Sequence, residues 1–146
     1  MAQKHHQNTD NFIPEYERET DLSEFSSIGQ EIIRNRENMG SLIEPDLIGK
    51  VRGCCGDSIQ IELQLNGDII QEARYTTDGC SATVAVGGMI TRLITHKTLQ
   101  QARELSSKDL IDALEGLPKG HNHCADLAIK TLQKTLEARF DEPLSQ

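Results

Sequence analysis

Residues 59–77, IQIELQLNGDIIQEARYTT, decide the fold of this chain. From Ile59 to Leu65, apolar residues alternate with polar ones, which is the two-residue period of a half-buried β-strand. Asn66-Gly67-Asp68 then favours a tight hairpin turn, and the chain resumes as a second strand from Ile69 to Thr77. Because another strand, Leu47 to Gly53, precedes the pair, the sequence predicts a three-stranded antiparallel meander.

Helical patterns lie on both sides of this meander in the sequence. The spacing of Asp21 and Glu24 is that of a capping box, and isoleucines follow at helical intervals, which predicts a helix from about Leu22 to Arg34. In the long helix after the meander, Gly87-Gly88 lowers helix propensity but allows close backbone approach. The helices predicted after the meander cover residues 82–97, 98–105, 107–114 and 123–140. Helices that flank an antiparallel sheet on one side make the predicted fold class α+β.

Length and composition limit the classes of protein to consider. The 146 residues suffice for one domain, predicted at 26–140, with a flexible polar extension at 1–25 and a tail at 141–146. No apolar run reaches the roughly 18 residues that span a bilayer, and the acidic N-terminus lacks a signal layout, so we expect a cytoplasmic protein without a membrane partner. A net charge of -8 and 3% aromatic residues argue against nucleic acid, which requires a basic face and stacking rings.

Three cysteine sites lie where predicted elements end. Cys55-Gly56-Asp57 follows the first strand, Gly79-Cys80 precedes the long helix, and His123-Cys124 begins the last helix. Helix N-termini favour thiolates, and thiolates in a reducing compartment are more often metal ligands or reactive groups than disulfides. A sulfur-rich set of this kind suits iron–sulfur clusters and Zn(II). The spacing alone contains no CxxC pair, so a shared metal site and three buried small hydrophobes remain equal alternatives.

A family resemblance separates these alternatives. The chain resembles the IscU/NifU iron–sulfur scaffold family over about Ser26 to Phe140, and residues 77–85 are most similar to its NifU-like members. The motifs that carry the resemblance, in the family's order, are Asn35-Arg36-Glu37-Asn38-Met39-Gly40, Cys55-Gly56-Asp57, Thr77-Asp78-Gly79-Cys80, and Leu117-Pro118 followed by His123-Cys124. The resemblance implies a metal site at one end of the domain, formed by loops and helix N-termini.

The resemblance also implies a role for each site residue. Cys55, Cys80 and Cys124 match the cysteines that accept sulfur and ligate a nascent cluster, Asp57 matches a metal ligand that influences cluster lability, and His123 matches a fourth ligand of zinc-bound members. The implied cargo is a 2Fe–2S or 4Fe–4S cluster, with Zn(II) in the cluster-free form. The implied partners are a cysteine desulfurase and apo iron–sulfur proteins. The oligomeric state is left open by the sequence, and a homodimer with a cluster bridging two chains is one alternative. The protein would then be a scaffold and carrier, and not an enzyme.

Departures from the family pattern keep alternatives open. The segment that reads Leu-Pro-Pro-Val-Lys in IscU members is Leu117-Pro118-Lys119-Gly120-His121, so chaperone recognition is not implied, and His121 adds a ligand or proton carrier. Cys54 would point away from Cys55 as a spare thiol or small packing residue. One rival function is a zinc-dependent sulfurtransferase like SufU, although the insertion typical of that branch is absent. A second rival is a desulfurase regulator with structural zinc. We expect the three site cysteines to lie outside the core.

Overall fold

The computed structural model describes residues 21–54 and 56–140. Within them, three strands are followed by the helices that cover the sheet, so the α+β class and the predicted meander are confirmed. The strands are β1 (Leu47–Arg52), β2 (Ser58–Asn66) and β3 (Ile69–Thr77). The helices are the 3₁₀ turn η1 (Leu22–Glu24), α3 (Ser27–Asn35), α4 (Ser81–Ile94), α5 (Leu99–Arg103), α6 (Ser107–Ala113) and α7 (Asn122–Phe140).

The sheet is a meander in the order β1-β2-β3, with both pairs antiparallel. Ile61 pairs with Gly49 on one side and with Tyr75 on the other, so the alternating residues of β2 point into the core as the sequence predicts. A register shift between Gln64 and Leu65 lies just before the hairpin turn. The two-residue period therefore fixes which face of the central strand is buried.

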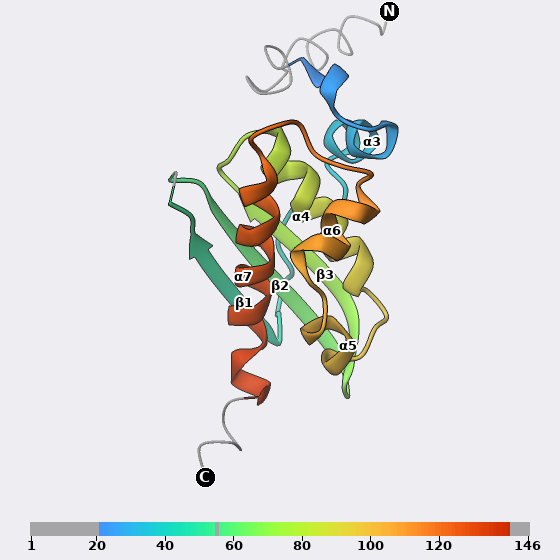
Figure 1. The fold of residues 1–146 in the computed structure, drawn as a ribbon. Coiled ribbons are helices and arrows are strands. Elements are labelled where there is room, and N and C mark those ends of the chain that lie inside the picture. The colour runs from blue at the N-terminus through green and yellow to red at the C-terminus, as the bar shows by residue number, and fades with distance from the viewer. Residues whose placement is uncertain (1–20, 55, 141–146) are drawn as a thin grey trace, which may run out of the picture.

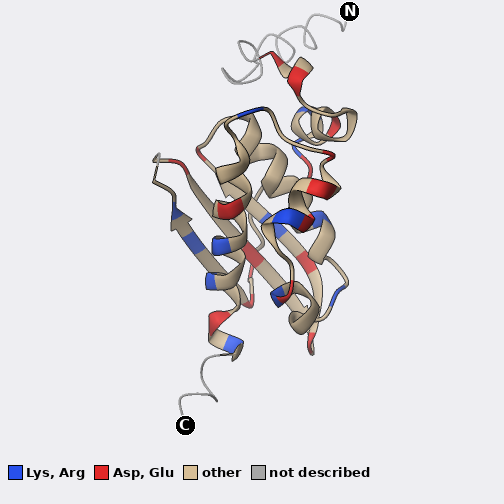
Figure 2. Ribbon diagram, viewed as in Figure 1, with Lys and Arg blue, Asp and Glu red and all other residues tan. Residues whose placement is uncertain are grey.

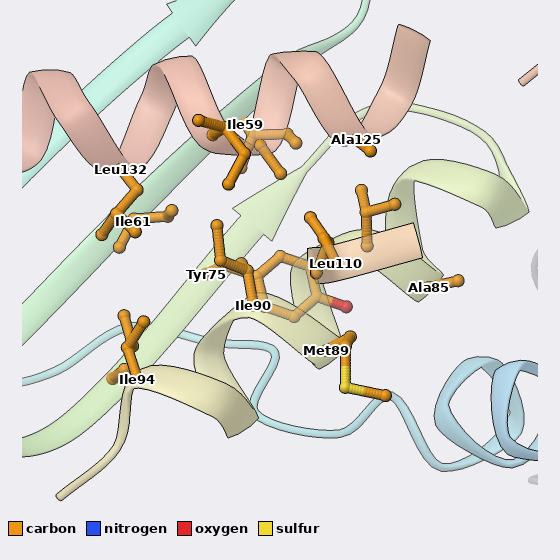
Figure 3. Packing of buried hydrophobic residues seen from close by; sticks show 14 of the residues in the cluster. Ile59, Ile61, Tyr75, Ala85, Met89, Ile90, Ile94, Leu110, Ala125 and Leu132 are labelled. Atoms are coloured by element: carbon orange, nitrogen blue, oxygen red, sulfur yellow. The ribbon is translucent and has the colours of Figure 1, made fainter. Parts of the chain in front are cut away.

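The core lies between this sheet and two helices, with α7 packed on β1 and β2 and α4 packed on β3 (Figure 1). Side chains of Ile61, Tyr75, Ile90 and Leu132 fill the space between the two layers (Figure 3). α4 is buried at every position from Ser81 to Thr91, as expected of a helix that is apolar on all sides.

The glycine pair in α4 has the predicted packing role. A Cβ at Gly87 would collide with the ring of Tyr75, and a Cβ at Gly88 would collide with the side chain of Ile32. The Tyr75 hydroxyl donates a hydrogen bond to the Val84 carbonyl at 3.0 Å. α4 can therefore lie against both β3 and α3 only because these two positions have no side chain.

The N-terminal helix begins later than predicted. Asp21 caps only the turn η1, and Ser26 caps α3, its Oγ accepting a hydrogen bond from the Gly29 amide at 3.0 Å. Asp and Ser are equally good N-caps, so the sequence alone does not choose between the two starts. Leu22 and Phe25 are nevertheless buried, so the packed chain includes residues that the sequence assigned to the 1–25 extension. Residues 1–20 and 141–146 lie outside the described residues.

The motif at residues 35–40, at the C-terminal end of α3, is hydrogen-bonded to α4 and β3. Arg92 donates two hydrogen bonds to the carboxylate of Glu37, and Asn38 Nδ2 donates to Thr91 Oγ1 at 3.2 Å. The backbone of residues 38–40 bonds to Tyr75 at the free edge of β3, through Tyr75 N to Asn38 O (3.1 Å) and Gly40 N to Tyr75 O (2.8 Å). We call residues 37–40 with these partners the Glu37 clasp.

The opposite edge of the sheet is β1. Its outward side chains include Lys50 and Arg52, which are exposed and stand out as basic positions on the outer strand (Figure 2). Charged side chains on an edge strand disfavour pairing with another chain. Among the described residues, no helix is long and apolar enough to cross a membrane.

Candidate functional site

Cys80 lies at the junction of β3 and α4, as predicted. It is the N-cap residue of α4, with extended backbone angles of φ -85° and ψ -173°, and its side chain makes no capping hydrogen bond to the helix. The residue is exposed. The sulfur is therefore accessible at a helix N-terminus, where the helix dipole favours a thiolate.

Cys124 lies in the first turn of α7, with only 1% of its surface exposed, and belongs to the core cluster. The expectation that all three site cysteines lie outside the core is therefore wrong for Cys124. The reason is the packing of α7, whose first turn is pressed against α4 and the sheet because Ala125 and Ala128 are also fully buried. Cys124 thus contributes to packing as well as to the site.

His121 lies close to both of these cysteines. Its ring offers a nitrogen that lies, with the sulfurs of Cys80 and Cys124, in a group whose ligand atoms are all within 4.8 Å of one another. Nδ1 of His121 is buried and has no hydrogen-bond partner among residues 21–54 and 56–140. Two sulfurs and an imidazole nitrogen at this separation can converge on one soft or borderline metal ion after small side-chain movements.

Asp57 lies beside the same group and is held there by Thr83. The Thr83 hydroxyl donates to Oδ2 of Asp57 at 3.3 Å and lies 3.8 Å from the sulfurs of both Cys80 and Cys124. A Cβ at Gly79 would come within 2.9 Å of Asp57 Oδ2, so the glycine leaves room for the carboxylate. The buried hydroxyl of Thr83 therefore connects the Asp57 carboxylate to the two cysteine sulfurs.

Sequence reasoning did not find Thr83. Its side chain is fully buried, and threonine in the first turn of an apolar helix is an ordinary packing residue. The signal that could have found it is its spacing of three residues from Cys80, which places both side chains on the same face of α4.

The two cysteines shift each other's pKa in opposite directions. A hydrogen bond from the Cys124 thiol, opposed by partial burial and aided by the backbone and hydroxyl of Thr83, lowers the pKa of Cys80 from 9.0 to about 4. The same hydrogen bond and burial raise the pKa of Cys124. At neutral pH Cys80 is thus a thiolate and Cys124 a thiol, so the exposed sulfur is the nucleophilic one.

The sequence singled out three further residues, His123, Cys54 and Cys55. His123 is exposed, its Nε2 lies 3.8 Å from the Cys124 sulfur, and it does not belong to the three-residue group. Cys54 is exposed in the connection between β1 and β2. Cys55 lies outside the described residues, so its ligand role stays a prediction. The β1–β2 connection and the N-termini of α4 and α7 do lie at one end of the domain (Figure 1).

A model of a known protein family matches most of the chain. The NifU-like N terminal domain matches residues 27–142. The chain belongs to this family. The match spans every strand and helix from α3 to α7, including Asp57, Cys80, His121 and Cys124.

Some relatives of this chain are named as scaffold proteins and another is named as a sulfurtransferase. The iron–sulfur cluster assembly scaffold protein IscU of Aquifex aeolicus is 32% identical over 106 residues, which cover 70% of this chain and 68% of the relative. The zinc-dependent sulfurtransferase SufU of Bacillus subtilis is 31% identical over 119 positions, covering 69% of this chain and 81% of the relative. That alignment is longer than the part of this chain it covers, so SufU holds residues without a counterpart here.

A solved structure shows the same fold. The crystal structure of the N-terminal part of a nitrogen-fixing NifU-like protein from Brucella abortus aligns with a TM-score of 0.59 at 17% identity, covering 80% of this chain and 94% of that one. The expected membership of the IscU/NifU family and the fold are thus both confirmed.

Proposed function

We propose that this protein is a scaffold and carrier that assembles a transient iron–sulfur cluster and hands it to apo-proteins. The observation that carries the proposal is the convergence of the Cys80 and Cys124 sulfurs with a His121 ring nitrogen, in a domain of the NifU family. Thiolate and imidazole ligands suit iron–sulfur clusters, whereas hard ions such as Mg(II) and Ca(II) prefer oxygen. Cys55, beside Asp57 in the sequence, is the third cysteine of the proposed ligand set.

The proposed source of sulfur is a cysteine desulfurase that presents a persulfide. The Cys80 thiolate attacks the terminal sulfur of that persulfide, a new S–S bond forms on Cys80, and the desulfurase cysteine leaves as a thiolate. Exposure and low pKa make Cys80 the best placed of the described cysteines for this attack. Reduction of the persulfide to sulfide for the cluster requires two electrons from an external reductant, such as a ferredoxin or a thiol.

A zinc-dependent sulfurtransferase is the second candidate. One observation favours it: a Cys₂His group is a common donor set for tetrahedral zinc, and SufU is among the relatives. Relatives named as iron–sulfur cluster assembly scaffold proteins, at 31% and 32% identity, favour the scaffold.

Anaerobic reconstitution separates the two candidates. The protein is incubated with ferrous iron, cysteine, a desulfurase and a thiol reductant, and the visible absorption and circular dichroism are recorded against a zinc-loaded sample. A scaffold forms a brown species with sulfide-to-iron charge-transfer bands and then activates an apo-ferredoxin. A protein that stays colourless, retains one zinc per chain and only increases desulfurase turnover is the sulfurtransferase.

Apo-acceptors and a homodimer around one cluster remain part of the proposal. Both are tested in the same preparation, by acceptor loading and by size-exclusion chromatography before and after reconstitution. The absence of any enzymatic activity of its own is likewise a proposal that the zinc-loaded sample tests.

A further inference from the structure

The chain has two histidines near the cysteines, and they occupy different environments. His121 belongs to the connection before α7, whereas His123 is already part of the first turn of the helix. His121 is half-buried and His123 is exposed. The family resemblance assigns the nitrogen ligand to His123, the residue next to the last cysteine, so the two positions compete for one role.

Backbone hydrogen bonds hold His121 in place. Its amide donates to the Pro118 carbonyl at 3.1 Å, and its carbonyl accepts from the Cys124 amide at 3.0 Å. Gly120, with φ of 85°, provides the left-handed residue that this tight turn requires. The turn therefore joins the position of His121 directly to that of Cys124.

The rings differ in what they can reach. A nitrogen of His121 lies within 4.8 Å of both sulfurs, while Nε2 of His123 lies 3.8 Å from the Cys124 sulfur and is not part of that three-residue group. Among the residues that the structure describes, the buried Nδ1 of His121 has no hydrogen-bond partner, which is unfavourable unless another atom approaches it. The His123 ring stacks on that of His121, with centroids 6.1 Å apart and planes inclined by 25°.

We propose that His121, and not His123, supplies the nitrogen ligand of the metal site, with His123 acting as its outer stacking neighbour. The inference rests on the proposed function, since it concerns the same site. It assigns the chain three described ligands, Cys80, Cys124 and His121. The ligand comes from the connection between Pro118 and α7, so the sequence change in that connection, His121 in place of lysine, alters the donor set itself.

Cobalt binding tests this assignment without a cluster. Co(II) is titrated anaerobically into wild type, His121→Ala, His123→Ala and Cys80→Ser, and thiolate-to-cobalt charge-transfer and ligand-field absorption are recorded. His121→Ala is expected to lose roughly 100-fold in affinity, because losing a ligand costs at least as much as losing a group that supports one. Its ligand-field bands should weaken as water replaces nitrogen. His123→Ala is expected to stay within about threefold of wild type.

Imidazole rescue separates a ligand from a packing residue. Free imidazole should restore the wild-type cobalt spectrum in His121→Ala and leave Cys80→Ser unchanged, whereas a packing defect would not respond. Far-ultraviolet circular dichroism and Tm of each variant serve as fold controls. Loss of binding in His123→Ala, with His121→Ala unchanged, overturns the assignment and leaves the scaffold function standing. Absence of thiolate-to-cobalt absorption in the wild type overturns the metal site and with it the proposed function.

Discussion

The Glu37 clasp and the end of the domain that holds Cys80, Cys124 and His121, which we call the cysteine end, are both formed by short motifs where helices and strands begin or end. They differ in how fully their polar groups are hydrogen-bonded. In the clasp, both carboxylate oxygens of Glu37 accept from Arg92, and the backbone of residues 38–40 bonds to Tyr75. At the cysteine end, the sulfurs of Cys80 and Cys124 interact with each other and make long contacts of 3.8 Å to Thr83, and Nδ1 of His121 has no hydrogen-bond partner within the described part of the chain.

This difference distinguishes motifs that stabilise the fold from motifs that bind an external ligand. Polar groups that satisfy one another stabilise the fold and gain nothing from an external ligand. Polar groups that converge without satisfying one another cost free energy in the isolated chain, and a metal ion or cluster recovers it. By this criterion residues 37–40 are structural, and the cysteine end is the functional part of the domain.

The largest expected effect comes from removing a sulfur. Cys80→Ser should abolish stable cluster assembly and change the Tm by no more than about 2 °C, because the side chain is exposed. Cys124→Ser should also abolish assembly, but should in addition cost about 1–2 kcal/mol, since a hydroxyl replaces a buried thiol in the core. Visible spectra after reconstitution and thermal unfolding of the apo-proteins measure the two effects. A Cys80→Ser variant that still assembles a stable cluster would remove Cys80 from the ligand set.

Weakening the Glu37 clasp should lower the stability of the fold and leave cluster assembly unchanged. Glu37→Gln weakens a partly buried, doubly hydrogen-bonded ion pair and should lower the Tm by roughly 5 °C, with cluster assembly unchanged. Asp112→Asn is the matched control, because the Lys108–Asp112 pair is largely exposed and its loss should shift the Tm by less than about 2 °C. If Glu37→Gln impaired assembly at a temperature where the variant is folded, the clasp would not be purely structural.

Asp57 tests how the cysteine end releases its cargo. If the carboxylate promotes exchange as a weak oxygen ligand, Asp57→Ala should hold its cluster longer and transfer it to an apo-ferredoxin roughly threefold to tenfold more slowly, the effect of one interaction of about 1 kcal/mol. Transfer is followed by circular dichroism at equal initial loading. Faster cluster loss than in wild type would show instead that Asp57 is a stabilising ligand.

Thr83 should act in the same direction as Asp57 with a smaller effect. Thr83→Val keeps the shape of the side chain but removes the hydroxyl that donates to Asp57, so transfer should slow by roughly twofold. Thr83→Ser retains the hydroxyl and should transfer as wild type does. Equal slowing in both variants would point to packing of α4 and not to the hydrogen bond.

The smallest effect is expected at Cys54. It is exposed and lies outside the three-residue group, so Cys54→Ser should leave assembly, transfer and Tm close to wild type. Persulfide mass spectrometry after a single desulfurase turnover provides the sharper measurement, since sulfur should be found on another cysteine. Loss of assembly in Cys54→Ser but not in Cys55→Ser would mean that the ligand position is shifted by one residue.

Most of the fold follows from local patterns in the sequence. The alternation in β2 and the Asn66-Gly67-Asp68 turn determine the sheet, and predicted strand bounds agree with the structure to within one residue. The start of α3 was wrong because two capping signals, Asp21 and Ser26, lie five residues apart, and only packing selects between them.

The site was predictable only in part, because its members meet through tertiary structure. Cys80 and Cys124 were found by thiol chemistry and motif. The family pattern favoured His123 over His121, since a turn at Gly120 that directs one ring inward leaves no periodic signal in the sequence. Thr83 was missed because a buried threonine becomes a hydrogen-bond donor to the site only when Asp57 comes beside it.

The burial of α4 from Ser81 to Thr91 has a consequence for hydrogen exchange. Amides in a helix enclosed on all sides exchange only through global or large sub-global unfolding, whereas those of short surface connections exchange through local opening. Cys80 begins the enclosed helix, while Asp57 and His121 lie on connections. Hydrogen exchange of the apo-protein should therefore show protected α4 amides and faster exchange in the connection that holds His121.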